Sequence, residues 1–222
     1  SRICGSGVQS IITGAQMIML GDANTVVAGG MENLSQAPHV LRGARDGWKL
    51  GRSPAVEDYM MTNLQDLTCG MYMAQTSDEI CNRKGVTREE IDQYAALSHA
   101  RITKSIEQGL FEQEIVPVTI KSRRGDIVIT HKDEDHVVSG CTSESLAKLP
   151  TAFGPESFVT AGNASGIVDG AAAVVIKSAT QAKADGDSPL ARIVSWGIVG
   201  LEPAIMAYGP VPSSLRLLKR LD

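Results

Sequence analysis

The sequence predicts a layered α/β fold, because helix-like and strand-like apolar patterns alternate near both ends of the 222-residue chain. Near the N-terminus, apolar residues recur every three or four positions from Val8 to Met19, and Gly21 follows as a helix-ending signal. A short apolar strand at residues 25–28 comes next, bounded by two glycines. The stretch from residue 34 to about residue 150 lacks this alternation, and we expect a mixed insertion there.

The alternation returns in the last third of the chain. We expect a buried strand at 171–176, a helix at 179–184 that ends at Gly186, and a second strand at 190–200. The run from Gly209 to Pro212 predicts a stiff turn before a last helix at 213–222.

Within the insertion, the spacing of apolar residues predicts a helix over 71–83. Thr87 and Glu90 form the capping-box pattern that starts a second helix. His99 lies on that helix, and we assign no chemistry to it. Residues 115–120 and 127–130 flank a polar turn and predict a β-hairpin.

Two polar stretches, residues 131–136 and 42–52, can each be interpreted in two ways. His131 and His136 lie among three acidic residues, which fits a hydrated acidic turn better than a metal site, and we expect no metal. The basic, glycine-rich segment 42–52 is either a solvated loop or a docking surface for an anionic ligand or another subunit.

Composition narrows the class of partner. The formal net charge is -4 and aromatic residues make up 4% of the chain, so we expect no nucleic-acid partner. No apolar run is long enough to predict a membrane span, so we expect no membrane partner. The four cysteines form no C-x-x-C pair and have no metal-ligand spacing, which favours a reduced, cytoplasmic location with Cys69, Cys81 and Cys141 as structural thiols.

Cys4 is the candidate nucleophile. It stands at the start of the first predicted helix, where the positive end of the helix dipole favours a thiolate over a thiol. Gly5 and Gly7 leave no side chain in the way of a reactant, and Ser6 adds only a hydroxyl. Most cysteines are inert small apolar residues, so position alone leaves both interpretations open.

Several motifs in order resemble those of the thiolases, the acetyl-CoA C-acyltransferases. Three runs resemble the nucleophile region of that family: Cys-Gly-Ser-Gly at 4–7, Val-Ala-Gly-Gly-Met-Glu at 27–32 and Ser-Gln-Ala-Pro at 35–38. Thr-Ala-Gly-Asn-Ala-Ser-Gly at 160–166 and Asp-Gly-Ala-Ala at 169–172 resemble a second family signature. Ala-Arg-Ile-Val-Ser at 191–195 and Gly-Pro-Val-Pro at 209–212 add further matches, so the resemblance covers essentially the whole chain.

The resemblance implies the layered α-β-α-β-α thiolase fold, present in part as a central fragment lacking both ends. Residues 1–33 would be the end of the N-terminal half, and 34–150 an inserted α+β loop domain. Residues 151–177 would complete the N-terminal half, and 178–222 would begin the C-terminal half. Family members are homodimers or homotetramers, and the basic segment 42–52 falls where similar enzymes carry loops for tetramer contacts.

The implied reaction is a reversible Claisen condensation through an acyl-cysteine at Cys4, with acyl-CoA and coenzyme A as substrates and no further cofactor. The amide of Cys4 would help to hold the developing oxyanion. By position, Ser165 would touch the pantetheine arm, Ala161 and Phe153 would line its tunnel, Ser145 and Leu64 would lie near the nucleotide, and Met73 and Met206 beside the acyl group. Tyr72 and Val138 depart from the histidine and arginine found in some members.

Three later family motifs are absent from the 222 residues: Asn-Glu-Ala-Phe, the Gly-His-Pro of the activating histidine, and the Cys-Gly-Gly of the acid/base cysteine. We therefore expect these residues alone to be inactive and the full-length protein to be a thiolase. The alternative is a non-catalytic thiolase-like subunit or CoA/acyl-binding module. A 3-oxoacyl-carrier-protein synthase is disfavoured by the Asn-Ala-Ser-Gly run at 163–166.

Overall fold

A computed structural model describes residues 2–129 and 136–221. The chain forms two compact units. The first consists of residues 1–65, 167–201 and 209–222, and the second of residues 66–166 and 202–208. Each unit is discontinuous in sequence, so segments distant along the chain fold together.

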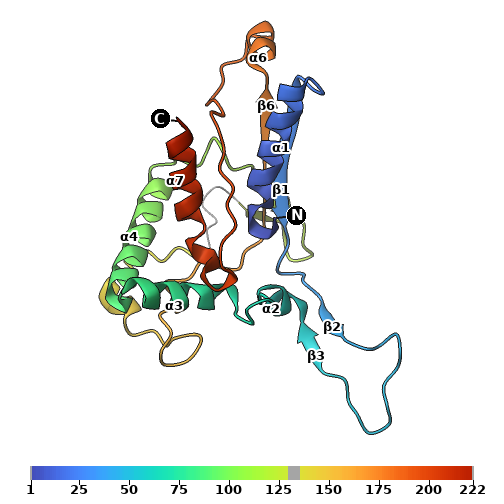
Figure 1. Cartoon of the computed structure of the whole chain (residues 1–222), viewed down its shortest axis with the longest axis vertical. Helices are drawn as coiled ribbons and strands as arrows, with labels where there is room; N and C mark the ends of the chain where they lie inside the picture. Colours follow the sequence, from blue (N-terminus) through green and yellow to red (C-terminus); the bar gives the residue numbers. More distant parts are fainter. Residues whose placement is uncertain (1, 130–135, 222) are drawn as a thin grey trace. The chain divides into compact units, whose positions relative to one another are not determined.

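The first unit is built around a two-stranded antiparallel sheet covered by a helix (Figure 1). The strands are β1 (Thr25–Glu32) and β6 (Gly170–Lys177), and the helix is α1 (Ser6–Leu20). Gly14 allows the close approach of helix to sheet, because a Cβ there would lie 3.0 Å from Val26 and 3.2 Å from Ile176. Ile12, Ala15 and Ala28 are buried at this contact.

The other elements of the first unit are shorter. They are the 3-10 turn η1 (Ile3–Gly5), the paired strands β2 (His39–Leu41) and β3 (Val56–Asp58), and the helices α2 (Tyr59–Asn63), α6 (Ala179–Asp185) and α7 (Pro210–Leu221). The β2–β3 pair brackets the basic segment 42–52, which is exposed along its length.

The second unit is mainly helical. Its helices are α3 (Met73–Lys84), α4 (Arg88–Glu107), α5 (Ser143–Leu146) and the 3-10 segment η2 (Pro203–Tyr208). A hairpin of β4 (Val118–Ile120) and β5 (Ile127–Ile129) completes it, as predicted. Thr87 and Glu90 form the predicted capping box: the Thr87 hydroxyl accepts from the Glu90 amide, and the Glu90 carboxylate accepts from the Thr87 amide at 2.8 Å.

The predicted helix at the N-terminus, the helix over 71–83 and the helix ended by Gly186 are confirmed. Gly21 and Gly186 both adopt the left-handed conformation that ends a helix, with φ of 83° and 74°. In each case the sequence signal was local, so the prediction did not depend on tertiary contacts.

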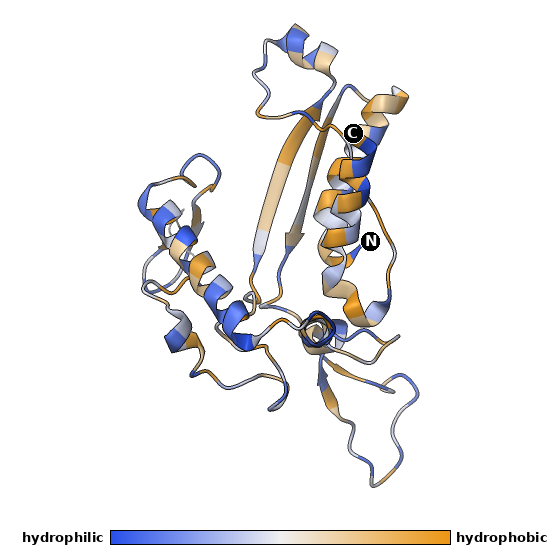
Figure 2. Ribbon diagram, turned by 60° about the vertical axis from the view of Figure 1, so that its left-hand side comes forward, coloured by the Kyte–Doolittle hydropathy of each residue, from blue (hydrophilic) through white to orange (hydrophobic). Residues whose placement is uncertain are grey.

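The prediction of buried strands is wrong in burial though right in position. Val27 and Val175 face each other in register but are 71% and 64% exposed. They lie on the sheet face opposite the Val26–Ile176 pair that meets α1. A two-stranded sheet with one helix covers only one face, so strand pattern alone did not reveal which residues would be buried. Figure 2 shows the apolar residues of both strands in orange.

The prediction of a strand at 190–200 is also wrong. This segment is irregular and lies alongside α7, to which it is hydrogen-bonded, instead of joining a sheet. Arg216 donates to the carbonyl of Ile198 at 3.1 Å, and Arg220 donates to that of Trp196 at 3.2 Å. Arginine side chains thus satisfy backbone groups that a strand partner would otherwise bond. The helix α7 begins at Pro210, not after the proline turn, because proline lacks only an amide that the first helical turn does not use.

The expectation that no segment could span a membrane needs correction. The helical stretch from Ile3 to Leu20 is long and apolar enough to do so by length and composition alone, with a mean hydropathy of 1.3. Mostly buried core helices of soluble proteins pass the same test, whereas 17% of this stretch is buried, including Gly14 at the β1–β6 sheet.

Candidate functional site

Cys4 is the middle residue of the turn η1, two residues before α1 begins at Ser6, and it is exposed. The residue before it, Ile3, has a φ of 50°, a left-handed conformation that β-branched residues rarely adopt. Strained backbone of this kind concentrates at functional sites, where surrounding structure holds it in place. The structure therefore places the predicted nucleophile at the mouth of a helix, on a constrained turn.

The first turn of α1 is fixed to the sheet by Ser10. Its hydroxyl donates to the carbonyl of Gly7 at 2.7 Å and lies 3.0 Å from the carbonyl oxygen of Gly29 in β1. Among the described residues, no side chain caps the helix at Gly5, but η1 continues into α1: the Ser6 amide donates to the carbonyl of Ile3, and the Gly5 amide to that of Arg2 at 3.0 Å. Cys4 thus lies at the start of α1, as the sequence predicted, and the reactivity of its thiol stays a prediction.

A second contact joins the segments that follow β1 and precede β6. The Ser35 amide donates to Asp169 Oδ1 at 2.9 Å, and the Ser35 hydroxyl donates to Asp169 Oδ2. Hydrogen bonds from the Ser35 hydroxyl and then its amide hold the pKa of the Asp169 carboxyl below its usual value. Two of the sequence motifs, residues 35–38 and 169–172, thus meet at one end of the sheet.

The remaining candidate residues divide between the two units. Cys4 and Leu64 belong to the first, in which Leu64 closes the C-terminus of α2. The second unit holds Met73, Ser145, Phe153, Ala161, Ser165 and Met206. Ser145, Ala161 and Ser165 are exposed, and Met73 and Phe153 are half-buried.

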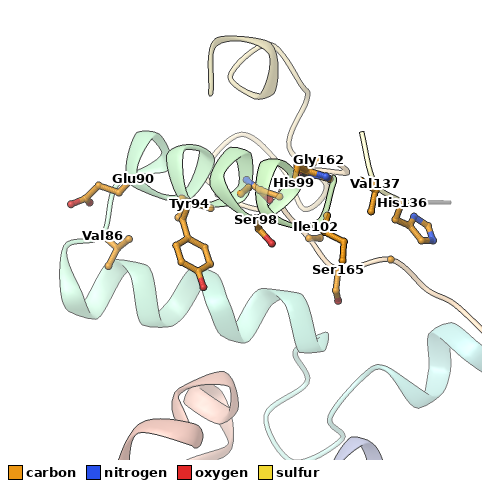
Figure 3. A pocket seen from close by; sticks show the side chains of 15 residues that line it. Val86, Glu90, Tyr94, Ser98, His99, Ile102, His136, Val137, Gly162 and Ser165 are labelled. Carbon is orange, nitrogen blue, oxygen red and sulfur yellow. Dashed lines mark hydrogen bonds between the residues drawn. The ribbon is translucent and has the colours of Figure 1, made fainter. Parts of the chain in front are cut away.

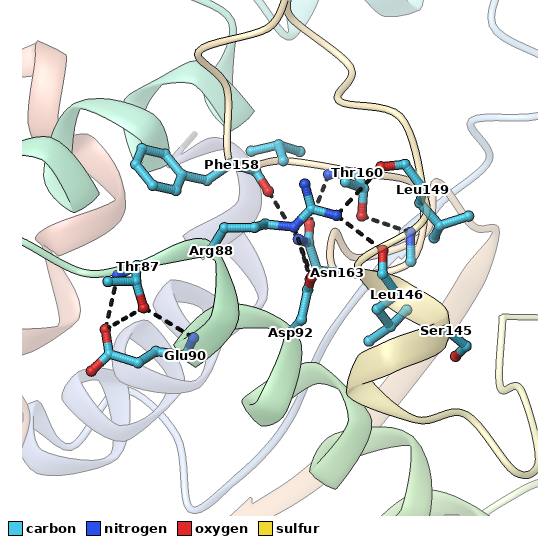
Figure 4. A network of polar contacts seen from close by, with 12 residues as sticks. Thr87, Arg88, Glu90, Asp92, Ser145, Leu146, Leu149, Phe158, Thr160 and Asn163 are labelled. Atoms are coloured by element: carbon cyan, nitrogen blue, oxygen red, sulfur yellow. Dashed lines mark hydrogen bonds and ion pairs between the residues drawn. The ribbon is translucent and has the colours of Figure 1, made fainter.

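The loop that carries Ala161 and Ser165 is held against α4 by a buried polar network (Figure 4). Asp92 is 1% exposed and uses both carboxylate oxygens: Oδ2 accepts from Arg88 Nε at 2.8 Å, and Oδ1 accepts from Asn163 Nδ2 at 3.0 Å. A buried carboxylate needs such partners, because unpaired burial of a charge is strongly unfavourable.

Asn163 extends this network into the backbone of its own loop. Its Nδ2 also donates to the carbonyl of Phe158 at 2.9 Å, and its Oδ1 accepts from the amide of Thr160 at 2.8 Å. The loop also packs closely, since a Cβ on Gly162 would lie 2.4 Å from Leu146 and 2.5 Å from Leu149. An alanine at 162 would therefore require the ends of the Leu146 and Leu149 side chains to move.

The same network reaches the helix that carries Ser145. Arg88 Nη2 donates to the carbonyls of Leu146 at 3.0 Å and Leu149 at 3.4 Å, at and just beyond the end of α5. At the other end of α5, the Thr142 hydroxyl accepts from the amide of Ser145. Arg88 thus fixes α5 and Asp92 together.

Tyr72 and Phe153 stack with ring centroids 5.8 Å apart and an angle of 27° between the rings. Tyr72 is the N-cap of α3, and Met73 is the first residue of that helix. The stack therefore brings two of the candidate positions, 73 and 153, to the N-terminus of α3 through the residue that departs from the family pattern.

Met206 lies in η2. An ion pair between Arg83 of α3 and Glu202, the residue before η2, connects the two elements. Arg83 donates to both carboxylate oxygens of Glu202, at 2.6 and 2.7 Å, and to Glu79 at 2.7 Å. Hydrogen bonds to Glu202 and then Glu79 raise the pKa of the Arg83 guanidinium. Lys84 lies 4.9 Å from the centre of the Tyr208 ring, a cation–π contact at the other end of η2.

A pocket of about 670 Å³ lies along α4 in the second unit (Figure 3). Of the predicted site residues in the described part of the chain, Ser165 alone lines it. His99 lines it too: its Nε2 lies 3.3 Å from the carbonyl oxygen of Gly162, and its Nδ1 accepts from the amide of Val138 at 3.3 Å. His99 thus links α4 to the 160–166 loop and to the segment at Val138.

The sequence analysis did not identify Arg88 and Asp92 as residues that bear on the site. The available signal was their spacing of four on a predicted helix, which places them on one face. That spacing could not show that Asp92 would be buried or that Asn163, 71 positions away, would complete the network.

The described cysteines are all free, and burial differs among them. Burial, followed by the nearby charge of Asp78, raises the pKa of the Cys81 thiol. Within residues 2–129 and 136–221, no group of three His, Cys, Asp or Glu side chains could hold a metal ion. The sequence offered a hydrated acidic turn or a metal site around His131 and His136. His131 and its three acidic neighbours, residues 133–135, lie outside the described residues.

The comparisons agree with this geometry. The family described as "Thiolase, N-terminal domain" matches residues 1–180. An acetyl-CoA acetyltransferase of Cupriavidus necator is 43% identical over the whole of this chain, which covers 56% of that protein. A mitochondrial 3-ketoacyl-CoA thiolase of Bos taurus is 42% identical over 99% of this chain, which covers 55% of it.

Solved structures give the same result. Human mitochondrial 3-ketoacyl-CoA thiolase superposes with a TM-score of 0.91 at 40% identity, over 98% of this chain and 54% of that one. A structure of the same human enzyme in complex with CoA gives a TM-score of 0.86 over 96% of this chain and 52% of that one. The chain therefore spans about half the length of the relatives it matches, with the predicted fold, and it belongs to the thiolase family.

Proposed function

We propose that this chain is the nucleophile-bearing part of an acyl-CoA C-acyltransferase that works through an acyl-cysteine at Cys4. The observation that carries the proposal is the exposed thiol of Cys4 at the start of α1, on a constrained turn, in a chain of this family. The Cys4 thiol is accessible to a substrate there, and a cysteine nucleophile can carry the acyl group between the two halves of the reaction.

In the thiolysis direction, the Cys4 thiolate attacks the keto carbon of a 3-oxoacyl-CoA. The bond between C2 and C3 breaks, and acetyl-CoA leaves as an enolate that takes up a proton. The thiolate of a second CoA then attacks the acyl-cysteine, forms the shortened acyl-CoA and releases the Cys4 thiolate. The amide of Cys4 would hold the oxyanion that forms in each addition step.

The proposed contacts to CoA and to the acyl group follow from position within the family. Ser165, Ala161 and Phe153 would contact the pantetheine arm, Ser145 and, from the first unit, Leu64 the nucleotide, and Met73 and Met206 the acyl group. The support is the family relationship together with the buried network that fixes the 160–166 loop. Coenzyme A acts as a substrate, and no further cofactor is part of the proposal.

The proton-transfer groups of the reaction lie outside these 222 residues. No histidine here stands in a Gly-His-Pro context, and no cysteine is followed by Gly-Gly. We propose that the full-length protein supplies both, forms homodimers or homotetramers, and acts in the cytoplasm. Its relatives include bacterial enzymes and a mitochondrial one, so the family is found in more than one compartment.

The test is thiolysis of acetoacetyl-CoA and of longer 3-oxoacyl-CoA by the full-length gene product and its Cys4→Ser variant. Removal of the nucleophile is expected to lower kcat by about 10⁴ or more, because the remaining groups act only as a unit with it. A Cys4→Ser variant with near-normal turnover would contradict the proposal. An intact mass near 23.5 kDa and no turnover would favour the binding-module alternative instead.

A further inference from the structure

We infer that Asp92 and Arg88 are positioning residues that hold the proposed CoA-binding loop and α5 in one fixed arrangement. The inference rests on the proposed function and adds to it, because neither side chain is among the residues assigned to CoA.

The geometric basis is that one ion pair on α4 serves both binding segments. Asp92 reaches the 160–166 loop through Asn163, and Arg88 reaches the end of α5 through the carbonyls of Leu146 and Leu149. Ser165 and Ala161 lie on the first segment, and Ser145 lies on the second. The Arg88–Asp92 pair is the point at which these two segments are joined.

Burial gives the pair its importance. The side chain of Asp92 is 2% exposed and that of Arg88 is 25% exposed, whereas the exposed side chains of Arg42 and Glu57 form the ordinary kind of surface pair at 68% and 33%. A surface pair contributes little, but removing one partner of a buried, hydrogen-bonded pair leaves the other unsatisfied.

The loop packs on Leu146 and Leu149 at Gly162 and contacts His99, and Asn163 adds the polar contacts that tie it to α4. It forms no strand or helix between residues 160 and 169, and Ala161, Ala164, Ser165 and Gly166 are exposed. Asn163 bonds Asp92, the Phe158 carbonyl and the Thr160 amide at once. Asparagine at position 92 would offer one acceptor oxygen to two donors, so either Arg88 Nε or Asn163 Nδ2 would lose its acceptor and the link between α4 and the loop would weaken.

A loop that must be ordered on binding weakens affinity, because the ordering cost is subtracted from the contact energy. That cost affects substrate and transition state alike, so it raises KM and leaves kcat nearly unchanged. A residue that acted only on global stability would not produce this split.

The experiment measures steady-state thiolysis, with CoA as the varied substrate, by full-length Asp92→Asn, Arg88→Lys and Glu89→Gln variants. Glu89 is the matched control, since it pairs with Gln93 at the same spacing on the exposed side of α4. Asp92→Asn is expected to raise KM for CoA about tenfold with kcat within about threefold of wild type. Arg88→Lys keeps a cation for Asp92 but loses the planar fork, so a smaller rise in KM is expected.

Amide hydrogen exchange of residues 158–166 is the second measurement, and it does not depend on activity. Exchange there should accelerate in Asp92→Asn and remain unchanged in Glu89→Gln. A folded Asp92→Asn variant with wild-type KM, or one that lowers kcat with KM unchanged, overturns the inference. Failure of the proposed function is a separate outcome, because it would appear as wild-type protein without thiolysis.

Discussion

Cys4 and Cys81 differ in their exposure to solvent. Cys4 is exposed at a helix mouth, whereas Cys81 is half-buried in α3, where burial and then Asp78 raise the pKa of its thiol. Because the thiolate is the reactive form, iodoacetamide near neutral pH should alkylate Cys4 before Cys81 in folded protein. Peptide mass spectrometry over a time course measures the two rates.

The control for that experiment is the denatured protein, in which all four cysteines should react at similar rates. Equal or faster alkylation of Cys81 in the folded protein would contradict the assignment of Cys4 as the accessible thiol.

Two adjacent glycines of β1, Gly29 and Gly30, differ in the space available for a side chain. A Cβ at Gly29 would lie 2.3 Å from the backbone oxygen of Ala172 in β6, so Gly29→Ala must push the strands apart. A Cβ at Gly30 would lie 3.7 Å from Gly7, an ordinary contact. Gly29→Ala is expected to destabilise the protein by about 2 kcal/mol, and Gly30→Ala by less than about 0.5 kcal/mol.

Urea unfolding of the two variants measures the difference in free energy. Because both substitutions lie in one strand and add the same methyl group, equal effects would contradict the β1–β6 register, which pairs Gly29 with Ala173.

Elements set by local signals were predictable from the sequence, and those set by tertiary contacts were not. Gly21, Gly186 and the Thr87–Glu90 box act within one helical turn, and each marked its helix end correctly. The apolar run at 190–200 resembled a strand, but its carbonyls of Trp196 and Ile198 bond arginines of α7 instead. Periodicity cannot reveal a partner distant in sequence.

The candidate site shows the same division. The helix behind Cys4 could be predicted, since glycine and apolar spacing define it locally. The role of Asn163 could not, because it depends on a carboxylate of α4 and a carbonyl five residues before it in the loop. Motif resemblance identified the loop, and only the fold showed what holds it.

Across the whole molecule, hydrogen-bonded carboxylates predict sensitivity to acid. Bonds from Thr87 hold the pKa of Glu90 below its usual value, as bonds from Ser35 do for Asp169, and four more groups are shifted downward: Asp66, Glu144, Asp185 and Glu202. A folded pKa below the unfolded one contributes stability that is present above the unfolded value and is lost as pH falls through the folded value.

Because these carboxylates lie at the surface, where water screens their interactions, the free energy of unfolding should fall gradually below about pH 4. Urea titrations between about pH 7 and pH 3 measure it, and Asp169→Asn should reduce the dependence by removing one of the six groups. A stability that stays constant across this range would contradict the assignment of these carboxylates as hydrogen-bond acceptors in the folded state.

Locating the covalent intermediate is the most direct test of an acyl-cysteine at Cys4. Full-length protein is mixed with acetyl-CoA, quenched in acid and digested, and the peptides are weighed. One added acetyl group is expected on the peptide that contains Cys4, and none on the same peptide of the Cys4→Ser variant. Turnover with no acetyl group on Cys4, or with the group on another residue, would contradict it.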